Sequence, residues 1–223
     1  MNLAKCRLWR PPGGGLCPVP RQLQEVPQVA LEEGLKVLGI PVGHLLFVDA
    51  QVNKTVRAME EACDLLGGLN NPQVAFDLLR YCGSACRVNH LLRGLPVSAT
   101  STGAGRAAAA LQATLADIVG EGLPDGAWAQ ARLPVRAGGL GVACPVLTGP
   151  AARVAASVDF VLGAEAKVGL PGAWAIPPPD FPEAADTLQC LIGHPVAPLR
   201  AWVESGVHLP DTAEEKVLVS GGQ

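Results

Sequence analysis

Between residues 49 and 93, apolar side chains recur at every third or fourth position, the spacing of helices with one buried face. Asp49 can cap a first helix and Gly67 can end it. Asn71 followed by Pro72 is typical of the start of a second helix. The expected buried stripes comprise Val52, Val56, Met59, Cys63 and Leu66 in the first helix, and Val74, Leu78, Cys82, Ala85, Asn89 and Leu92 in the second. The pattern therefore predicts a helical hairpin.

The segments on either side of this hairpin are shorter or less regular. Upstream, Gly34–Gly43 is an apolar run interrupted by glycine and proline, which predicts two short strands joined by a tight turn. Downstream, the Ser/Thr/Gly-rich stretch 97–105 is expected to be a loop. Helices are expected over 106–119 and after Pro150, the latter with valines turned inward. Aromatic residues make up only 4% of the chain, so small aliphatic side chains must form the core, which favours closely packed helices. The fold class is predicted to be mainly α.

One glycine-rich motif stands out in the second half of the chain. Leu133-Pro134 is followed by Gly138-Gly139-Leu140-Gly141, with three glycines in four residues. Such a cluster indicates that the backbone passes close to another group. Beyond it, the Pro-rich run 176–182 predicts an irregular end to the chain, with at most short helices.

The charges are unevenly distributed. The formal net charge is −3, but residues 1–158 hold 14 basic against 11 acidic residues, and residues 159–223 hold 3 against 9. No acidic residue occurs in three windows: 5–21, 80–106 and 132–153. Basic surfaces joined to an acidic tail fit a phosphate-binding protein. The alternative, scattered and solvated arginines, is equally compatible with the sequence.

The seven cysteines and the absence of long apolar runs bear on the environment of the protein. An odd number of cysteines behind an N-terminus with no signal-peptide pattern predicts reduced thiols and an intracellular location. Charges and prolines interrupt every apolar run, so no membrane span is expected.

Two motifs with possible chemistry are weak. Cys82, Cys86 and His90 would share one helical face and offer three zinc ligands, but a fourth ligand is missing and buried cysteine is common. Gly103-Ala104-Gly105 resembles a dinucleotide-binding pattern, but no buried strand precedes it. No metal or cofactor is therefore assigned to this chain.

Several motifs together resemble reverse transcriptases of retrotransposons that lack long terminal repeats. Residues 2–6 (Asn-Leu-Ala-Lys-Cys) and 35–43 (Leu-Lys-Val-Leu-Gly-Ile-Pro-Val-Gly) resemble the last two palm motifs of that family, the second of which is the primer grip. Further similarity follows in residues 71–75, 78–83, 91–96 and 133–141, up to about residue 162.

The resemblance implies roles for individual residues. Lys5 would lie near the phosphates of the incoming nucleotide, and Leu38 and Gly39 would hold the primer end. The helices after the hairpin would form a thumb, with Arg80, Arg87 and Arg93 on the backbone of a template-primer duplex. The segments would then be 1–43, the end of the palm; 44–102, a thumb-like helical hairpin; 103–170, a helical region; and 171–223, a Pro-rich acidic tail.

The chain departs from this family at the catalytic centre. Nucleotidyl transfer in the family uses Mg²⁺ held by paired aspartates, which precede the segment that begins at Asn2, and no adjacent Asp-Asp pair occurs here. The expectation is an inactive fragment that at most binds template-primer duplex, or the missing palm. Self-association is also expected, because Leu35, Val37 and Ile40 would lose their cover. A non-enzymatic α-helical protein-interaction module is the alternative.

Overall fold

The structure is a computed structural model that describes residues 6–9, 21–30, 32–83, 85–168 and 179–196. Across these residues it contains seven α-helices and one two-stranded antiparallel hairpin, as the mainly α prediction requires. The chain divides into two compact units, residues 1–54 and residues 55–223. None of the helices in the described part of the chain is long and apolar enough to cross a membrane.

The first unit contains the predicted hairpin. Strand β1 (Gly34–Val37) pairs with β2 (Ile40–Gly43), and Val37 lies opposite Ile40. Leu38 and Gly39 form the two-residue turn, with φ of 52° and 86°. Positive φ at both positions is typical of a type I′ turn, whose twist matches that of the strands it joins. The hairpin therefore forms where the sequence predicts it.

Helix α1 (Leu45–Gly67) begins one turn earlier than predicted and runs from the first unit into the second. Its first turn is satisfied by His44 rather than by Asp49. The imidazole Nδ1 of His44 accepts the Leu46 N–H at 3.3 Å, and the His44 carbonyl accepts the Val48 N–H at 3.1 Å. Because these groups meet the free N–H groups of a helix start, Asp49 lies inside the helix and is not its cap.

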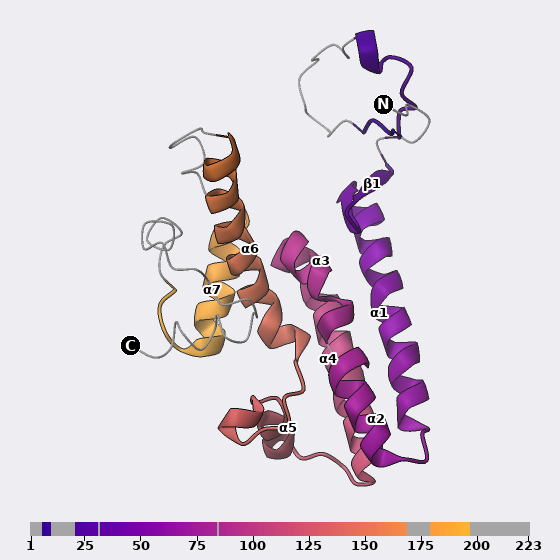
Figure 1. Cartoon of the computed structure of the whole chain (residues 1–223), viewed down its shortest axis with the longest axis vertical. Helices are drawn as coiled ribbons and strands as arrows, with labels where there is room; N and C mark the ends of the chain where they lie inside the picture. The colour runs from indigo at the N-terminus through magenta and orange to yellow at the C-terminus, as the bar shows by residue number, and fades with distance from the viewer. Residues whose placement is uncertain (1–5, 10–20, 31, 84, 169–178, 197–223) are drawn as a thin grey trace. The chain divides into compact units, whose positions relative to one another are not determined.

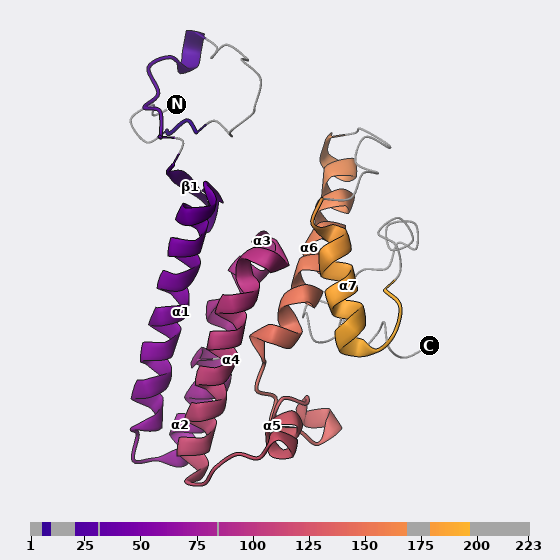
Figure 2. The same cartoon turned by 180° about the vertical axis from the view of Figure 1, so that it is seen from behind.

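The second unit is built from the end of α1 and a succession of helices. The elements after α1 are α2 (Pro72–Leu78), η3 (Leu79–Gly83), η4 (Ala85–Arg87), α3 (Asn89–Gly94), α4 (Val97–Val119), α5 (Asp125–Ala131), η5 (Val135–Ala137), α6 (Pro145–Val168) and α7 (Phe181–Ile192). Helix α4 packs against α2 and α6, and α6 also packs against α3 and α7 (Figures 1 and 2). Thr100 and Thr114 of α4 are buried, but their hydroxyls donate to the carbonyls four residues earlier, of Pro96 and Ala110.

The single helix predicted from residue 72 to residue 93 is broken into four pieces. Its start is as expected, because Asn71 Oδ1 accepts the Val74 N–H at 3.2 Å. After Leu78 the chain forms a π-helical turn, η3, and then the 3-10 turn η4. At Gly83, a Cβ would lie 3.1 Å from Cδ1 of Leu66 on α1. The glycine thus allows the irregular turn to lie against α1. The prediction of one helix, with a bend allowed at Gly83-Ser84, is wrong beyond residue 78, where the helix is interrupted and not merely bent.

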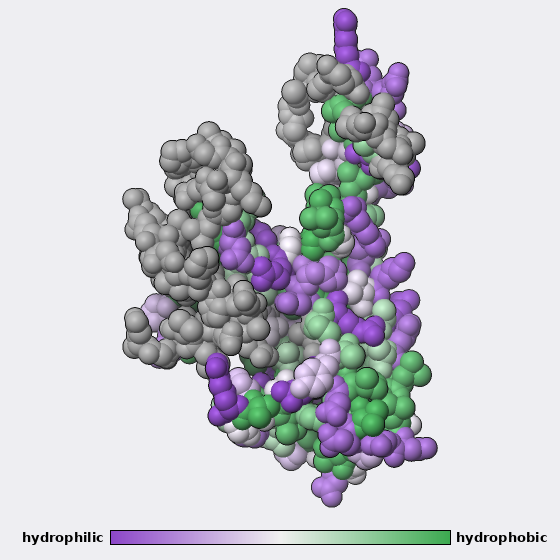
Figure 3. Space-filling model, viewed as in Figure 1, coloured by the Kyte–Doolittle hydropathy of each residue, from purple (hydrophilic) through white to green (hydrophobic). Residues whose placement is uncertain are grey.

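The buried face of α2 also differs from the prediction. Ala75 and Leu79 are almost completely buried, whereas Val74 and Leu78, expected in the core, are 48% and 38% exposed. Figure 3 shows apolar side chains at the surface over α2 and the lower end of α1. The sequence carries apolar residues on two adjacent faces of α2. Periodicity alone does not distinguish the buried face from the exposed one, and the face predicted to be buried is the exposed one.

The loop predicted over 97–105 is the beginning of α4. Pro96 lies at its N-cap position with an extended backbone, and the Ala99 N–H bonds to the Pro96 carbonyl at 3.1 Å. Gly103 and Ala104 are buried, so the small residues that suggest a loop allow neighbouring helices to approach closely. This stretch is therefore helical because of its packing against neighbouring helices, although its residues have low helix propensity.

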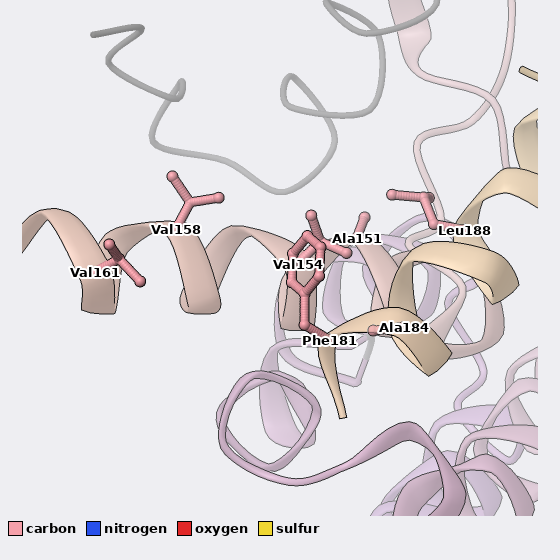
Figure 4. Close-up of a cluster of buried hydrophobic side chains, with 7 residues drawn as sticks. All are labelled: Ala151, Val154, Val158, Val161, Phe181, Ala184 and Leu188. Atoms are coloured by element: carbon pink, nitrogen blue, oxygen red, sulfur yellow. The ribbon is translucent and has the colours of Figure 1, made fainter. Parts of the chain in front are cut away.

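Helices α6 and α7 share a hydrophobic cluster (Figure 4). Three valines on α6, predicted to face inward, are at most 6% exposed. They pack with side chains of α7, a twelve-residue helix in a stretch for which only short helices were expected. The cluster comprises Ala151, Val154, Val158, Val161, Phe181, Ala184 and Leu188.

Candidate nucleic-acid interface

Arg80 lies where two of the family-like motifs meet. Its guanidinium carbon is 5.0 Å from the centroid of the Tyr81 ring, within the range of a cation–π contact. On another side it lies next to Gly141, at which a Cβ would be 3.2 Å from Nε and Nη2 of Arg80. Residues 78–83 and 133–141 are thus joined through one side chain.

The glycine-rich motif forms a compact turn after α5. Gly141 has φ of 70°, which a residue with a Cβ adopts only with strain. At Gly139, a Cβ would lie 2.0 Å from the carbonyl oxygen of Leu133. The N–H groups of Leu140 and Val142 both bond to the Ala131 carbonyl at 3.2 Å, and the Gly141 N–H bonds to the Leu133 carbonyl at 2.9 Å. The prediction of close backbone approach at this motif is confirmed.

Two further arginines, Arg132 and Arg136, belong to the same turn. The Arg132 guanidinium lies over the ring of Trp128, 5.6 Å from its centroid. Its Nε is buried and has no hydrogen-bond partner among the described residues. Arg136 is exposed in η5. Arg132 and Arg136 thus lie on the turn that follows α5, and Arg80 lies on η3. We call these three arginines the arginine–glycine site.

Arg87 and Arg93, predicted to contact nucleic acid, lie in different settings. Arg87 is exposed, and its Nε donates to the Cys82 carbonyl at 3.0 Å. Arg93 donates to Asp159 on α6 at 3.0 Å, in an ion pair that is a third to a half exposed. Part of the charge of Arg93 is therefore already neutralised within the fold. The structure does not group Arg93 with Arg80.

The predicted primer-grip residues lie in the first unit. The side chain of Leu38 is 97% exposed at the tip of the hairpin, and Gly39 completes the turn. Val37 is 52% exposed, whereas Leu35 and Ile40, which were expected to be uncovered, are half-buried. Lys5 lies outside the described residues.

The structure supports neither of the two weak motifs. Within the residues it describes, no group of three or more His, Cys, Asp or Glu side chains is arranged to hold a metal ion. Cys86 Sγ points to the carbonyls of Tyr81 and Cys82, each at 3.6 Å, and the turns η3 and η4 interrupt the expected helical row. Gly103-Ala104-Gly105 lies inside α4 and does not precede a helix.

Two ionisable groups outside the arginine–glycine site have shifted pKa values. Burial raises the pKa of the Cys63 thiol on α1, so the thiol stays protonated at neutral pH. The hydrogen bond from Arg153 lowers the pKa of Asp180 below its ordinary value of 3.8. Cys63 faces Thr114 on α4, and Asp180 is paired with Arg153 on α6.

The chain was compared with protein-family models, with curated proteins and with solved structures, and none of them matches it. From the sequence, Arg80 was expected as a contact and 132–153 as a basic window, but Arg132 and Arg136 were not singled out. The glycines that follow Arg136 were a further signal, because the close backbone approach there puts Gly141 beside Arg80.

Proposed function

We propose that the second unit binds nucleic-acid duplex through the phosphate backbone, and that the chain is a fragment related to retrotransposon reverse transcriptases. The observation that carries the proposal is the contact of Arg80 with Gly141. It joins two motifs of the family resemblance that are more than fifty residues apart and that each carry an arginine. A chance similarity of unrelated short motifs gives no reason for such a contact.

The electrostatics of the site favour phosphate as its ligand. Among the described residues, two arginines of the site, Arg132 and Arg136, take part in none of the ion pairs that the fold forms. Guanidinium groups held against aromatic rings lose little side-chain entropy on binding, and their forked donors suit phosphate oxygens. Contacts of this kind bind duplex without regard to sequence.

Binding is measured by fluorescence anisotropy of a labelled RNA–DNA hybrid with the full chain at several salt concentrations. We expect affinity to fall steeply with salt, because each phosphate contact releases counterions. Arg80→Gln and Arg132→Gln should each weaken binding several-fold and reduce the salt slope by about 1.

Arg57→Gln is the matched control, since Arg57 is an exposed arginine on α1 outside the arginine–glycine site. An equal effect of all three substitutions would show that only net charge matters. Association that does not respond to salt would contradict the proposal altogether.

The proposal includes no polymerase activity for the isolated chain. In the family the aspartates that hold Mg²⁺ supply the chemistry, and this sequence contains no adjacent pair of them. Purified protein is expected not to extend an annealed primer in the presence of Mg²⁺, and measurable extension would refute this expectation. The ancestry is tested separately, by translating the DNA upstream of the Met1 codon and searching for a Y-x-D-D motif.

A further inference from the structure

The end of α1 and the beginning of α2 carry an apolar surface that the fold leaves open. Leu65 is 76% exposed and Tyr81 is 66% exposed, and three smaller exposures lie between them along the chain. Figure 3 shows apolar side chains gathered over these two elements. We call this surface the corner patch; its members are Leu65, Leu69, Val74, Leu78 and Tyr81.

The solvent-facing residues of α1 change from charged to apolar at the corner patch. The preceding outer positions of α1 carry charges, among them Arg57, Glu61 and Asp64, all exposed. From Leu65 onward the outer face becomes apolar. In α2, Ala75 already faces the core, whereas Val74 and Leu78 form an exposed apolar stripe beside the exposed polar residues Gln73 and Asp77, so α2 carries apolar residues on two sides. A helix that is apolar on both sides is normally covered on both sides.

The size of the corner patch suits a symmetric pair. Its five side chains expose roughly 500 Å² of surface, near the upper end for the largest apolar patch of an ordinary monomer. Two copies that bury it against each other would remove roughly 1,000 Å², about the minimum for a specific interface. In a twofold interface the same patch serves both subunits, so no other complementary surface is needed.

We propose that the chain forms a homodimer in which the corner patch of one copy packs against the corner patch of another. The helices α1 and α2 of each copy then lie against those of its partner, as in a four-helix bundle. A phosphate backbone is a poor alternative occupant of the patch, because its five members are uncharged and the nearest guanidinium, that of Arg80, lies over the Tyr81 ring at one edge. The inference does not depend on the proposed nucleic-acid binding.

Val74→Glu is the decisive variant, because its effects on folding and on dimerisation have opposite signs. Val74 is the third residue of α2 and its N–H is bound by the cap residue Asn71. A glutamate at this position can bond back to the cap and interacts favourably with the helix dipole, so α2 should be stabilised or unchanged. The same carboxylate lies in the middle of the proposed interface. It should raise the dissociation constant of the dimer at least tenfold, which corresponds to roughly 1.4 kcal/mol.

Dimerisation is measured by sedimentation velocity of the full chain over a wide range of concentrations, with the melting temperature recorded for each variant. We expect the wild type to shift from the 23.0 kDa monomer toward a dimer as concentration rises. Leu65→Glu should weaken dimerisation as Val74→Glu does. Because the Leu65 side chain is exposed, this substitution removes no contact in the core. Val135→Glu is the matched control, an exposed valine in η5 outside the patch, and should dimerise like the wild type.

Three results would overturn the proposal. The first is a wild-type chain that remains monomeric at every concentration. The second is a dimer that persists in both patch variants, or that Val135→Glu weakens equally. The third is loss of the dimer on Leu38→Asn alone, which would assign the interface to the hairpin of the first unit.

Discussion

Asp180→Asn tests whether one ion pair attaches α7 to the rest of the second unit. Arg153 on α6 binds both carboxylate oxygens of Asp180, with Nε on Oδ2 and Nη2 on Oδ1, the latter at 2.8 Å. Its Nη1 donates to the Arg93 carbonyl at 3.0 Å. The two side chains are 16% and 13% exposed. One guanidinium thus joins the end of α3, the middle of α6 and the start of α7.

The magnitude follows from this geometry. Removing one partner of a buried ion pair costs about 3 to 5 kcal/mol, and an exposed pair is worth at most about 1 kcal/mol. The pair lies between these limits but nearer the buried one, so we expect Asp180→Asn to lower the free energy of unfolding by about 2 to 3 kcal/mol. For a chain of this size that is a fall in melting temperature of about 4 to 12 °C. Arg153→Gln should cost more, because it also removes a donor from the Arg93 carbonyl.

Thermal and urea unfolding followed by circular dichroism measure these values, and the double variant completes a mutant cycle. Neighbouring groups that interact directly should give a coupling free energy of about 1 to 2 kcal/mol. Asp186→Asn, at an exposed position of α7, is the control and should change stability by less than about 0.5 kcal/mol. The reasoning is refuted if Asp180→Asn is as stable as this control.

The same pair predicts a pH dependence. Arg153 lowers the folded-state pKa of Asp180 below its ordinary value of 3.8. The carboxylate therefore contributes its full stabilisation above that value and loses it as pH falls through the lowered folded-state pKa. The stability difference between wild type and Asp180→Asn should shrink in this acidic range. A difference that stays constant down to pH 2 would contradict the assignment.

Three further predictions concern other parts of the chain. Gly139→Ala should cost more than about 3 kcal/mol or prevent folding of the turn, because its Cβ would lie 2.0 Å from the Leu133 carbonyl oxygen, and circular dichroism would show the loss. Leu38→Asn should stabilise the hairpin by about 0.5 to 1 kcal/mol, since Asn-Gly suits a type I′ turn, and should increase protection of hairpin amides from hydrogen exchange; faster exchange would contradict the turn assignment. Cys63 is buried and its thiol pKa is raised, so iodoacetamide should leave Cys63 unmodified while it alkylates the exposed Cys82. Mass spectrometry measures the labelling, and equal labelling of the two cysteines would contradict this prediction.

The sequence identified most helices but not which residues each one buries. The α1 stripe was correct at Val52, Val56 and Met59, because the outer face of the middle of that helix is mostly polar or charged. In α2 two adjacent faces are apolar, and the burial of Leu79 follows from its position against α4, which no local pattern contains. The stretch 97–105 was assigned to a loop for a related reason, since small residues favour both loops and close helix packing.

Pairing of charges is likewise a property of the folded chain. The windows 80–106 and 132–153 contain no acidic residue, which favoured free basic surfaces. In the structure Arg93, Arg106 and Arg153 nevertheless form ion pairs, with carboxylates that are 27 to 66 positions away in the sequence. A window without acidic residues shows a local excess of positive charge along the sequence. It does not show whether those arginines are left unpaired at the surface of the folded chain.

By itself, the sequence determined the hairpin and its turn, the helix start at the cap residue Asn71, and the close approach at the glycine motif. These depend on steric and hydrogen-bonding preferences of a few neighbouring residues. Only the tertiary structure decided that Arg80 meets Gly141, that Arg153 holds Asp180, and that the expected core stripe of α2 lies at the surface. Such outcomes depend on contacts between distant segments, and these are set by how whole helices pack.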